Sequence, residues 1–515
     1  MARHPGSTGS RVGAAVAAIL AAGLAGAQYA QVGGKLIGAG AAGAARQGYS
    51  VAISSDALTA VVGGWGDAAD TGAAWVFTRA GGGWSQQGGK LVGAGAVGPG
   101  RQGRAVAVSG DGSTAIVVAP YDDGDTGAAW VYTRSAGVWS QQGGKLVGTG
   151  AAGTAAQGWS VALSADGDTA IVGGIWDGSD AGAAWVFTRS AGAWSQQGDK
   201  LVGAGAVGPA YQGYSVALSA DGDTALVGGV GDSGFVGAAW VFARSAGVWS
   251  QQGPKLVGAG ADGASFQGYS AALSADGGTA LVGGYGDGSD RGAAWVFARS
   301  GGAWTQLGAR LVGAGAVGAA AQGWSVALSG DGRTAVLGGP SDAGNAGAAW
   351  VFRRADQDWL QVGEKLVGAG MVGAASQGAV AVSADGATIV AGGSFDDALT
   401  GAAWVFAAPA PCQPPAISAQ PRGVAVARGG TASLAVTATG SPPLAYQWYQ
   451  GESGDTSTPV GDGGGGLTTP PLAVATSFWV RVGNACGSVD SATATVAIAG
   501  AVRRHVAGAP APVGP

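Results

Sequence analysis

A repeat of about 55 residues runs through most of the chain and restricts its fold more than any other feature. The tetrapeptide Gly-Ala-Ala-Trp occurs seven times, at intervals of 55, 55, 55, 55, 55 and 54 residues. Its tryptophans are Trp75, Trp130, Trp185, Trp240, Trp295, Trp350 and Trp404. Repeats of this length are typical of β-propeller blades and other repeat architectures. The sequence therefore predicts seven copies of one structural unit.

Each copy is expected to form four short strands. In the third copy these strands are predicted at 159–163, 169–172, 183–188 and 194–202. A tight turn at 165–168 and a glycine-rich loop at 173–182 separate the first three. Beyond the first 27 residues, no apolar period of 3.6 residues indicates a helix. Four strands per repeat predict a propeller blade.

The phase of the repeat predicts a closed ring. The propeller region, taken as residues 28–407, begins with a strand-four sequence at 29–36 and ends after a strand-three sequence at 402–406. The last blade thus lacks a fourth strand, while the first segment has one to spare. Pairing the two removes two exposed sheet edges. The expected fold class is all-β, a seven-bladed β-propeller followed by a smaller β-domain.

The repeats also resemble a known family. Gln157-Gly158-Trp159-Ser160-Val161-Ala162, followed by Val172-Gly173-Gly174 and Gly182-Ala183-Ala184-Trp185, is similar to the FG-GAP repeat. That repeat builds the seven-bladed head of integrin α-subunits and occurs in many secreted bacterial proteins. Here Gln-Gly replaces the family's Phe-Gly, and Gly-Ala-Pro survives as Val118-Ala119-Pro120 and Gly338-Gly339-Pro340. The resemblance implies the propeller fold and a secreted protein.

The segment 408–499 lacks the repeat and is expected to form an immunoglobulin-like (Ig-like) β-sandwich. Strands are predicted at 416–419, 432–439, 444–449, 467–474, 478–482 and 492–498. Trp448 resembles the core tryptophan of Ig-like domains, as found in modules of bacterial secreted proteins. Val436 and Val480 occupy the usual places of the inter-sheet cysteines.

The chain has two cysteines, Cys412 and Cys486. In an exported protein we expect them to form a disulfide. It would close a loop of about 75 residues and stabilise the domain by roughly 3 to 4 kcal/mol in the chain-entropy model. The alternative is two unpaired thiols.

The two ends of the chain are expected to lie outside the folded domains. Residues 1–27 have basic residues before a short apolar segment and small residues at 25–27, which is typical of a signal peptide. A retained anchor helix is the alternative. Residues 500–515 are expected to form a flexible tail. The predicted location is secreted or extracellular.

The composition limits the chemistry. Charged residues make up 11% of the chain, and its two histidines, His4 and His505, lie near the ends. A histidine base, a Cys/His zinc site and a Ser-His-Asp triad are therefore hard to build. The remaining ionisable residues that differ between copies, such as Arg101 and Arg104, fall at different phases of the repeat, so their convergence is doubtful. We do not expect an enzyme.

Two series of aspartates recur at fixed phase. One lies in the tight turn, as in Ser164-Ala165-Asp166-Gly167. The other lies in the glycine-rich loop and comprises Asp67, Asp122, Asp177, Asp232, Asp287, Asp342 and Asp396. We expect these aspartates to cap turns by accepting backbone N–H bonds. The alternative is calcium binding in the loops, notably at Asp67, Asp122, Asp177 and Asp287, but calcium prefers six to eight oxygen ligands. No other cofactor is expected.

A series of basic residues shares the same period: Lys35, Lys90, Lys145, Lys200, Lys255, Arg310 and Lys365. These side chains are expected to pair with an aspartate of the blade or to line the outer rim. As surface ion pairs, they would stabilise the fold only slightly.

Aromatic residues precede the loop aspartate in five copies: Trp65, Tyr121, Trp176, Tyr285 and Phe395. The other two copies have Val230 and Pro340 there. If the loops converge on one face, these five residues form a ring of flat surfaces, because aromatic rings stack on sugars and anchor protein partners. The alternative is that they only cover the blade ends.

The sequence therefore favours a non-catalytic binding or adhesion protein whose loops contact an extracellular carbohydrate or protein. The net charge of −5 argues against a nucleic-acid partner, and no membrane span is expected after residue 27. We expect a monomer. The alternatives are a secreted hydrolase or lyase acting on polysaccharide and a structural protein of the cell envelope.

Overall fold

The computed structural model describes residues 28–409, 413–484 and 486–500. The expected signal peptide at 1–27, almost all of the expected tail and Cys412 lie outside these residues. The chain divides into two compact units, residues 1–408 and 409–515. Each is described by itself. Within the described part of the chain, no helix is long and apolar enough to cross a membrane.

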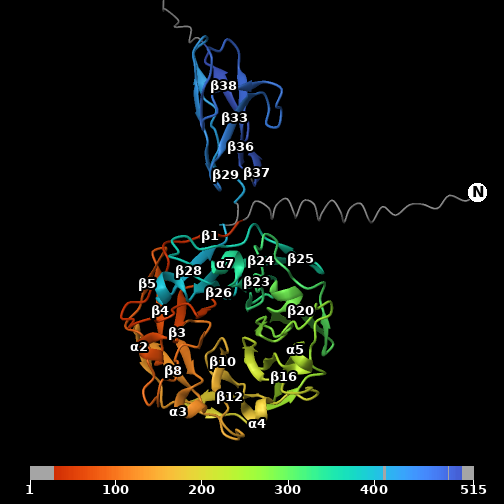
Figure 1. Ribbon diagram of the computed structural model, residues 1–515. Coiled ribbons are helices and arrows are strands. Elements are labelled where there is room, and N and C mark those ends of the chain that lie inside the picture. Colours follow the sequence, from red (N-terminus) through yellow and green to blue (C-terminus); the bar gives the residue numbers. More distant parts are fainter. Residues whose placement is uncertain (1–27, 410–412, 485, 501–515) are drawn as a thin grey trace, which may run out of the picture. The chain divides into compact units, whose positions relative to one another are not determined.

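The first unit is a ring of seven four-stranded antiparallel sheets, or blades (Figure 1). The first four blades comprise β2 (Ser50–Ile53), β3 (Thr59–Gly64), β4 (Ala73–Ala80) and β5 (Gly83–Gln86); β6 (Ala105–Val108), β7 (Thr114–Ala119), β8 (Ala128–Ser135) and β9 (Val138–Gln141); β10 (Gln157–Leu163), β11 (Thr169–Gly174), β12 (Ala183–Ser190) and β13 (Ala193–Gln196); and β14 (Gln212–Leu218), β15 (Thr224–Gly229), β16 (Ala238–Ser245) and β17 (Val248–Gln251).

The remaining blades comprise β18 (Ser270–Leu273), β19 (Thr279–Gly284), β20 (Ala293–Ser300) and β21 (Ala303–Gln306); β22 (Ser325–Leu328), β23 (Thr334–Gly339), β24 (Ala348–Ala355) and β25 (Asp358–Gln361); and β26 (Gln377–Val382), β27 (Thr388–Gly393), β28 (Ala402–Ala407) and β1 (Ala30–Gln31). This arrangement confirms the predicted seven-bladed fold.

The last blade is completed by the start of the chain, as predicted. Strand β1 pairs with β28, with Ala30 opposite Ala407 and Gln31 opposite Phe406. The Tyr29 hydroxyl donates a hydrogen bond to the Gly386 carbonyl at 2.5 Å, far along the sequence. These contacts join residues more than 350 positions apart and close the ring.

The repeated tryptophan fills the space between neighbouring blades. Trp185 is fully buried, and its indole N–H donates to the Thr149 carbonyl at 2.8 Å. Its ring lies flat against Gly148, where an added Cβ would stand 2.1 Å from Trp185 Cδ1. The glycine therefore allows the close approach of indole and backbone on which the packing between blades depends.

Two local features differ from the expected blade. The fourth strand of the third blade, β13, ends at Gln196 instead of running to residue 202. The chain turns near Gly198, which has a left-handed backbone (φ +70°), and Leu201 returns to the sheet in one bridge with Ala184. Each glycine-rich loop also contains one short helical turn, which the sequence reading did not predict.

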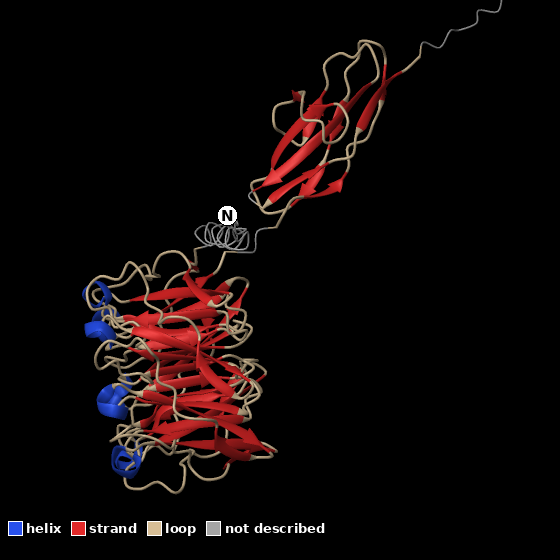
Figure 2. Cartoon of the chain, turned by 90° about the vertical axis from the view of Figure 1, so that its right-hand side faces the viewer, coloured by secondary structure: helices blue, strands red, loops and turns tan. Residues whose placement is uncertain are grey.

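These helical turns are α2 (Asp67–Asp70), α3 (Asp122–Asp125), α4 (Asp177–Asp180), α5 (Asp232–Phe235), α6 (Asp287–Asp290), α7 (Asp342–Asn345) and α8 (Asp396–Leu399). Their central residues have left-handed backbone angles, such as φ 60° at Gly178 and 57° at Ser179. They lie together on one side of the propeller, here called the helical-turn face (Figure 2).

The second unit is an Ig-like sandwich. Its strands are β29 (Ala416–Ala419), β30 (Ala425–Val426), β31 (Ser433–Ala435), β32 (Thr437–Thr439), β33 (Ala445–Gln450), β34 (Pro459–Val460), β35 (Gly466–Thr468), β36 (Thr476–Asn484), β37 (Gly487–Asp490) and β38 (Ala494–Ile498). The largest sheet has the order β30-β38-β36-β33-β34, with β37 also beside β36; β29 pairs with β32 and β31 with β35.

Trp448 lies in the core of this unit, as predicted, together with Val436 and Val480. The strand expected at 432–439 is divided into β31 and β32, and the short strands β30, β34 and β37 were not predicted. The expected disulfide between Cys412 and Cys486 stays a prediction because Cys412 is not described.

Candidate functional site

In six of the seven repeats, the residue that follows the Gln-Gly pair reaches the mouth of the central channel. In the third blade, Gln157 fixes the local backbone: its Oε1 accepts from the Gly148 N–H at 2.5 Å and its Nε2 donates to the Gly148 carbonyl at 2.9 Å. Gly158 then adopts a left-handed backbone (φ +90°), and the register of strand β10 shifts between Gln157 and Ser160. This bulge presents Trp159 to the channel.

Six side chains in this position surround a cavity of about 250 Å³ at that mouth. We call them the inner ring: Tyr49, Arg104, Trp159, Tyr214, Tyr269 and Trp324. All six are half-buried. Ring centroids lie 5.5 Å apart for Trp159 and Tyr214, 4.7 Å for Tyr214 and Tyr269, and 4.6 Å for Tyr269 and Trp324. The sequence reading did not single out this ring.

The seventh blade contributes no residue to the inner ring. Ala379 pairs with Gly392, as Ser325 pairs with Gly338 in the sixth blade. The one-residue deletion in the last repeat therefore removes the residue that would have joined the ring. A second cavity of about 180 Å³ lies at this gap, between Tyr49 and Trp324.

The five aromatic residues predicted to bind a ligand lie around the inner ring, and we call them the outer aromatics. Centroid distances are 5.9 Å from Trp65 to Tyr49, 6.3 Å from Trp176 to Trp159 and 5.4 Å from Tyr285 to Trp324. Tyr121 lies 6.5 Å from Trp159, and Phe395 lines the second cavity. Four are half-buried, whereas Phe395 is 44% exposed. The structure thus gathers all five on one face, and ligand binding by them stays a prediction.

Two arginines stack between the outer aromatics. The Arg46 guanidinium lies 4.6 Å from the Trp65 ring and 5.1 Å from the Phe395 ring. The Arg101 guanidinium lies 4.6 Å from Trp65 and 4.8 Å from Tyr121. Both arginines have left-handed backbone angles, φ 56° and 61°, which non-glycine residues seldom adopt. The equivalent residues of the other blades share this conformation, so it belongs to the repeat: Ala156, Tyr211, Phe266, Ala321 and Ser376.

These arginines belong to the helical-turn face. The Arg46 N–H donates to Leu399 of α8, and the Arg101 N–H donates to Asp70 of α2. Arg104 lies three residues after Arg101 in the inner ring. Arg101 and Arg104, whose convergence the repeat phase makes doubtful, lie on the same face but against different aromatic rings.

Arg104 is the charged member of the inner ring. Its guanidinium lies 5.0 Å from the Tyr49 ring and 4.4 Å from the Trp159 ring. Among the residues that the structure describes, it has no carboxylate partner and no hydrogen-bond acceptor. Burial by itself lowers the pKa of Arg104, but the neighbouring tyrosines raise that pKa above its ordinary value, so the side chain stays protonated.

The inner ring also contains polar groups that are poorly solvated. Burial raises the pKa of the Tyr269 hydroxyl well above its ordinary value, so this group stays neutral. The indole N–H groups of Trp159 and Trp65 are buried without a hydrogen-bond partner. A buried donor without an acceptor is unfavourable by about 1–3 kcal/mol. The site therefore contains buried donors without acceptors near a cation.

The loop aspartates named as candidate calcium ligands are held by protein groups instead. In the third blade, Asp177 Oδ2 lies 2.5 Å from the Lys200 ammonium, and Oδ1 accepts from the Ala152 N–H at 2.7 Å. Asp67 and Asp122 are paired with lysines in the same way, and Asp287 with Arg310. No group of three or more His, Cys, Asp or Glu side chains within the described ranges is placed to hold a metal ion.

The aspartates of these pairs are buried, at 0–3% exposed, whereas their basic partners are 17–25% exposed. The expectation of weak surface ion pairs is therefore wrong. Removing one partner of such a buried pair is strongly destabilising because the other charge is left without compensation.

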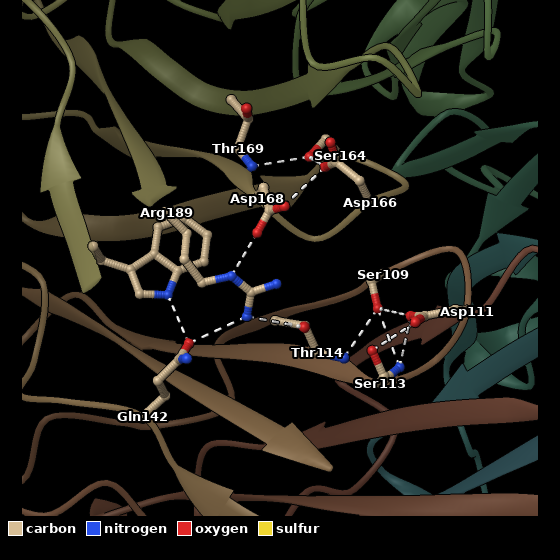
Figure 3. A network of polar contacts seen from close by, with 11 residues as sticks. Ser109, Asp111, Ser113, Thr114, Gln142, Ser164, Asp166, Asp168, Thr169 and Arg189 are labelled. Atoms are coloured by element: carbon tan, nitrogen blue, oxygen red, sulfur yellow. Dashed lines mark hydrogen bonds and ion pairs between the residues drawn. The ribbon is translucent and has the colours of Figure 1, made fainter. Parts of the chain in front are cut away.

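The turn aspartates lie at the opposite ends of the first strands, away from the inner ring. Asp166 accepts hydrogen bonds from the Ser164 hydroxyl and from the Asp168 N–H, which closes the tight turn (Figure 3). Arg189 then joins this blade to the preceding one by donating to Asp168 at 2.6 Å and to Gln142 at 3.2 Å. This network accounts for the repeated turn residues without a ligand.

Comparison with known proteins agrees with the Ig-like fold of the second unit. A family model described as an Ig-like domain, CHU_C associated, matches residues 414–499. No curated protein matches the chain in sequence. Because the matched model lies in the second unit, the resemblance of the propeller repeats to the FG-GAP family stays a prediction.

Three solved structures illustrate the structural likeness. The GH74 xyloglucanase from Xanthomonas campestris is 15% identical over 80% of this chain and 59% of that one, with a TM-score of 0.41. The β-propeller domain of the Trilobed protease from Pyrococcus furiosus is 9% identical over 67% and 90%, with a TM-score of 0.37. A chimeric titin Z1Z2 is 22% identical over 17% and 96%, with a TM-score of 0.15. Likeness at this level carries no information about function.

Proposed function

We propose that the protein is a secreted, non-catalytic carbohydrate-binding protein and that the helical-turn face of its propeller binds an extracellular glycan. The observation that carries this proposal is the inner ring around a cavity of about 250 Å³, with outer aromatics packed beside it. Aromatic rings present flat apolar surfaces, which suit the apolar faces of sugar rings. A concave, aromatic-lined site with a few polar groups is typical of ligand binding.

The proposed role is non-catalytic because of the kinds of side chain that reach the helical-turn face. The inner ring and the outer aromatics contribute aromatic rings and one guanidinium, and none of them is a carboxylate or an imidazole. Glycoside hydrolysis ordinarily requires a pair of carboxylates close to the bond that breaks. Of the loop aspartates, Asp67 and Asp177 are buried in ion pairs with lysines, and Asp70 at the end of α2 is paired with Arg101.

The second unit supports the proposed location. Ig-like domains of the CHU_C-associated kind are typical of secreted or surface proteins, and the first 27 residues have the pattern of a signal peptide. An exported propeller with an Ig-like module fits a role outside the cell.

A glycan array probed with labelled full-length protein tests the proposal. We expect binding, and we expect Trp65→Ala combined with Trp176→Ala to weaken it at least tenfold. The matched control is Trp139→Ala combined with Trp194→Ala, because these tryptophans are also half-buried but lie on the outer strands β9 and β13, where they stack on arginines. The control should bind like the unaltered protein. Absence of glycan binding, or an equal loss in both double variants, would contradict the proposal.

A further inference from the structure

The two mouths of the propeller channel differ in chemistry. The cavity at the far mouth, about 160 Å³, is lined by small and apolar residues such as Ile53, Leu163 and Leu218. The mouth on the helical-turn face has five aromatic side chains and one guanidinium. A charge at one of six equivalent positions breaks the sequence symmetry of the ring. The side chains best suited to bind a ligand therefore lie at one mouth, beside Arg104.

The guanidinium of Arg104 has unused binding capacity. It lies between two aromatic faces, and its N–H donors reach no acceptor on any residue that the structure describes. Stacking on aromatic rings leaves the edge of a guanidinium open, and that edge matches a carboxylate with two parallel hydrogen bonds. The neighbouring buried N–H of Trp159 is a further donor without an acceptor. The open edge of the guanidinium favours an anion at this side of the cavity.

The remaining surroundings favour a sugar as the carrier of that anion. Tyr214, Tyr269 and Trp324 line the same cavity as Arg104. The gap left by the deletion adds hydroxyl groups, because Ser341 and Ser394 line the second cavity, and neither hydroxyl is bonded to another residue in the described part of the chain. The cavities of about 250 and 180 Å³ are smaller than the roughly 300–1,000 Å³ of pockets for drug-sized ligands.

We propose that the channel mouth is a binding site for an acidic sugar, in which Arg104 binds the carboxylate, the inner-ring aromatics stack on the pyranose, and the gap beside Ala379 admits the next sugar of the chain. The site is lined by residues of every blade and lies on the axis of the propeller. This inference rests on the proposed carbohydrate binding and adds the charge of the ligand and its position.

Titration calorimetry with the full-length protein and three probes tests the proposal: 1,4-linked trigalacturonate, its neutral counterpart trigalactose, and tetraglutamate. We expect trigalacturonate to bind at least tenfold more tightly than trigalactose. Arg104→Met should weaken trigalacturonate binding by about 10- to 100-fold, because a hydrogen bond to a charged group is lost. Binding of trigalactose should change little, and Arg104→Lys should restore part of the loss.

Two further variants separate binding from folding. Arg134→Met is the matched control, because Arg134 stacks on Trp139 at 5.5 Å far from the site, and it should leave trigalacturonate binding unchanged. Inserting a tryptophan between Gly378 and Ala379 restores the repeat pattern, so the protein should fold. The added side chain should fill the gap and weaken trigalacturonate binding at least tenfold.

The outcomes distinguish this inference from the proposed function. If neutral glycans bind and Arg104→Met has no effect on any probe, the acidic-sugar inference is wrong while carbohydrate binding stands. If tetraglutamate binds and trigalacturonate does not, the ligand is an acidic peptide and the inference is also wrong. If no glycan binds on the array or in the calorimeter, both the proposed function and the inference are contradicted.

Discussion

At the scale of single residues, the near-identity of the blades provides internal controls for the effect of each side chain. Equivalent positions have nearly equal burial and partners, so a residue that differs from its six equivalents can be judged against them. Tyr132 is such a residue: it is 4% exposed, whereas the same position in the other blades holds phenylalanine at 3–4% exposed, as in Phe187 and Phe242.

The hydroxyl of Tyr132 is buried without a hydrogen-bond partner, and burial raises its pKa. We expect Tyr132→Phe to stabilise the propeller by about 1 kcal/mol, because a buried, unpaired hydroxyl is removed while the ring is kept. Urea denaturation measures this difference. The reverse change, Phe187→Tyr, should destabilise by a similar amount. A destabilised Tyr132→Phe variant would show that the hydroxyl has a partner in solution.

At the scale of the blade, the sequence predicted the strands because their signals repeat in phase with the tryptophan. The short helical turns were not predicted. Their left-handed backbone angles occur at alanine, serine and aspartate as well as at glycine, so no single residue type indicates them. The inner ring was missed for another reason. Its members share one phase of the repeat, but that phase lies outside the glycine-rich loop that holds the predicted aromatic residues. A comparison of residues after Gln-Gly would have shown five aromatics and Arg104.

The glycine that faces the buried tryptophan determines how closely blades pack. We expect Gly148→Ala to destabilise the propeller by about 1–3 kcal/mol, because the new methyl would lie 2.1 Å from Trp185 Cδ1 and would force the indole out of position. Gly144→Ala is the control: that glycine is exposed, has no atom within 4 Å of the added Cβ, and should tolerate the change. Thermal and urea denaturation compare the two. Equal stability of both variants would contradict this account of the packing between blades.

At the scale of the whole molecule, closing the ring makes the channel mouth possible. The inner ring draws its residues from six blades, and its gap lies in the seventh, which is the blade completed by the start of the chain. The period predicted both the number of blades and the closure. The period could not predict the cavity at the gap. That cavity depends on which position of the shortened repeat is missing, and only the strand pairing of Ala379 with Gly392 shows this.

The closing segment should hold the propeller together as one cooperative unit. Residues 28–37 supply strand β1, the buried side chains of Tyr29 and Leu36, and Lys35, whose ammonium lies 2.5 Å from the buried Asp396 carboxylate. Deleting this segment removes two buried side chains, each worth about 2–5 kcal/mol, and leaves the Asp396 charge unpaired. It also exposes the edge of β28, which favours aggregation.

We therefore expect a protein without residues 28–37 to lose stability by at least 5 kcal/mol, or to aggregate, with hydrogen exchange fastest in β26, β27 and β28. The matched truncation removes residues 409–515, which form a separate compact unit with its own core. This second truncation should leave the melting of the propeller nearly unchanged, because no propeller sheet loses a strand. Calorimetry and hydrogen-exchange mass spectrometry on both truncations measure the difference. If the first truncation melted like the second, the ring would be held by its blade-to-blade contacts alone, and the closing strand would be dispensable.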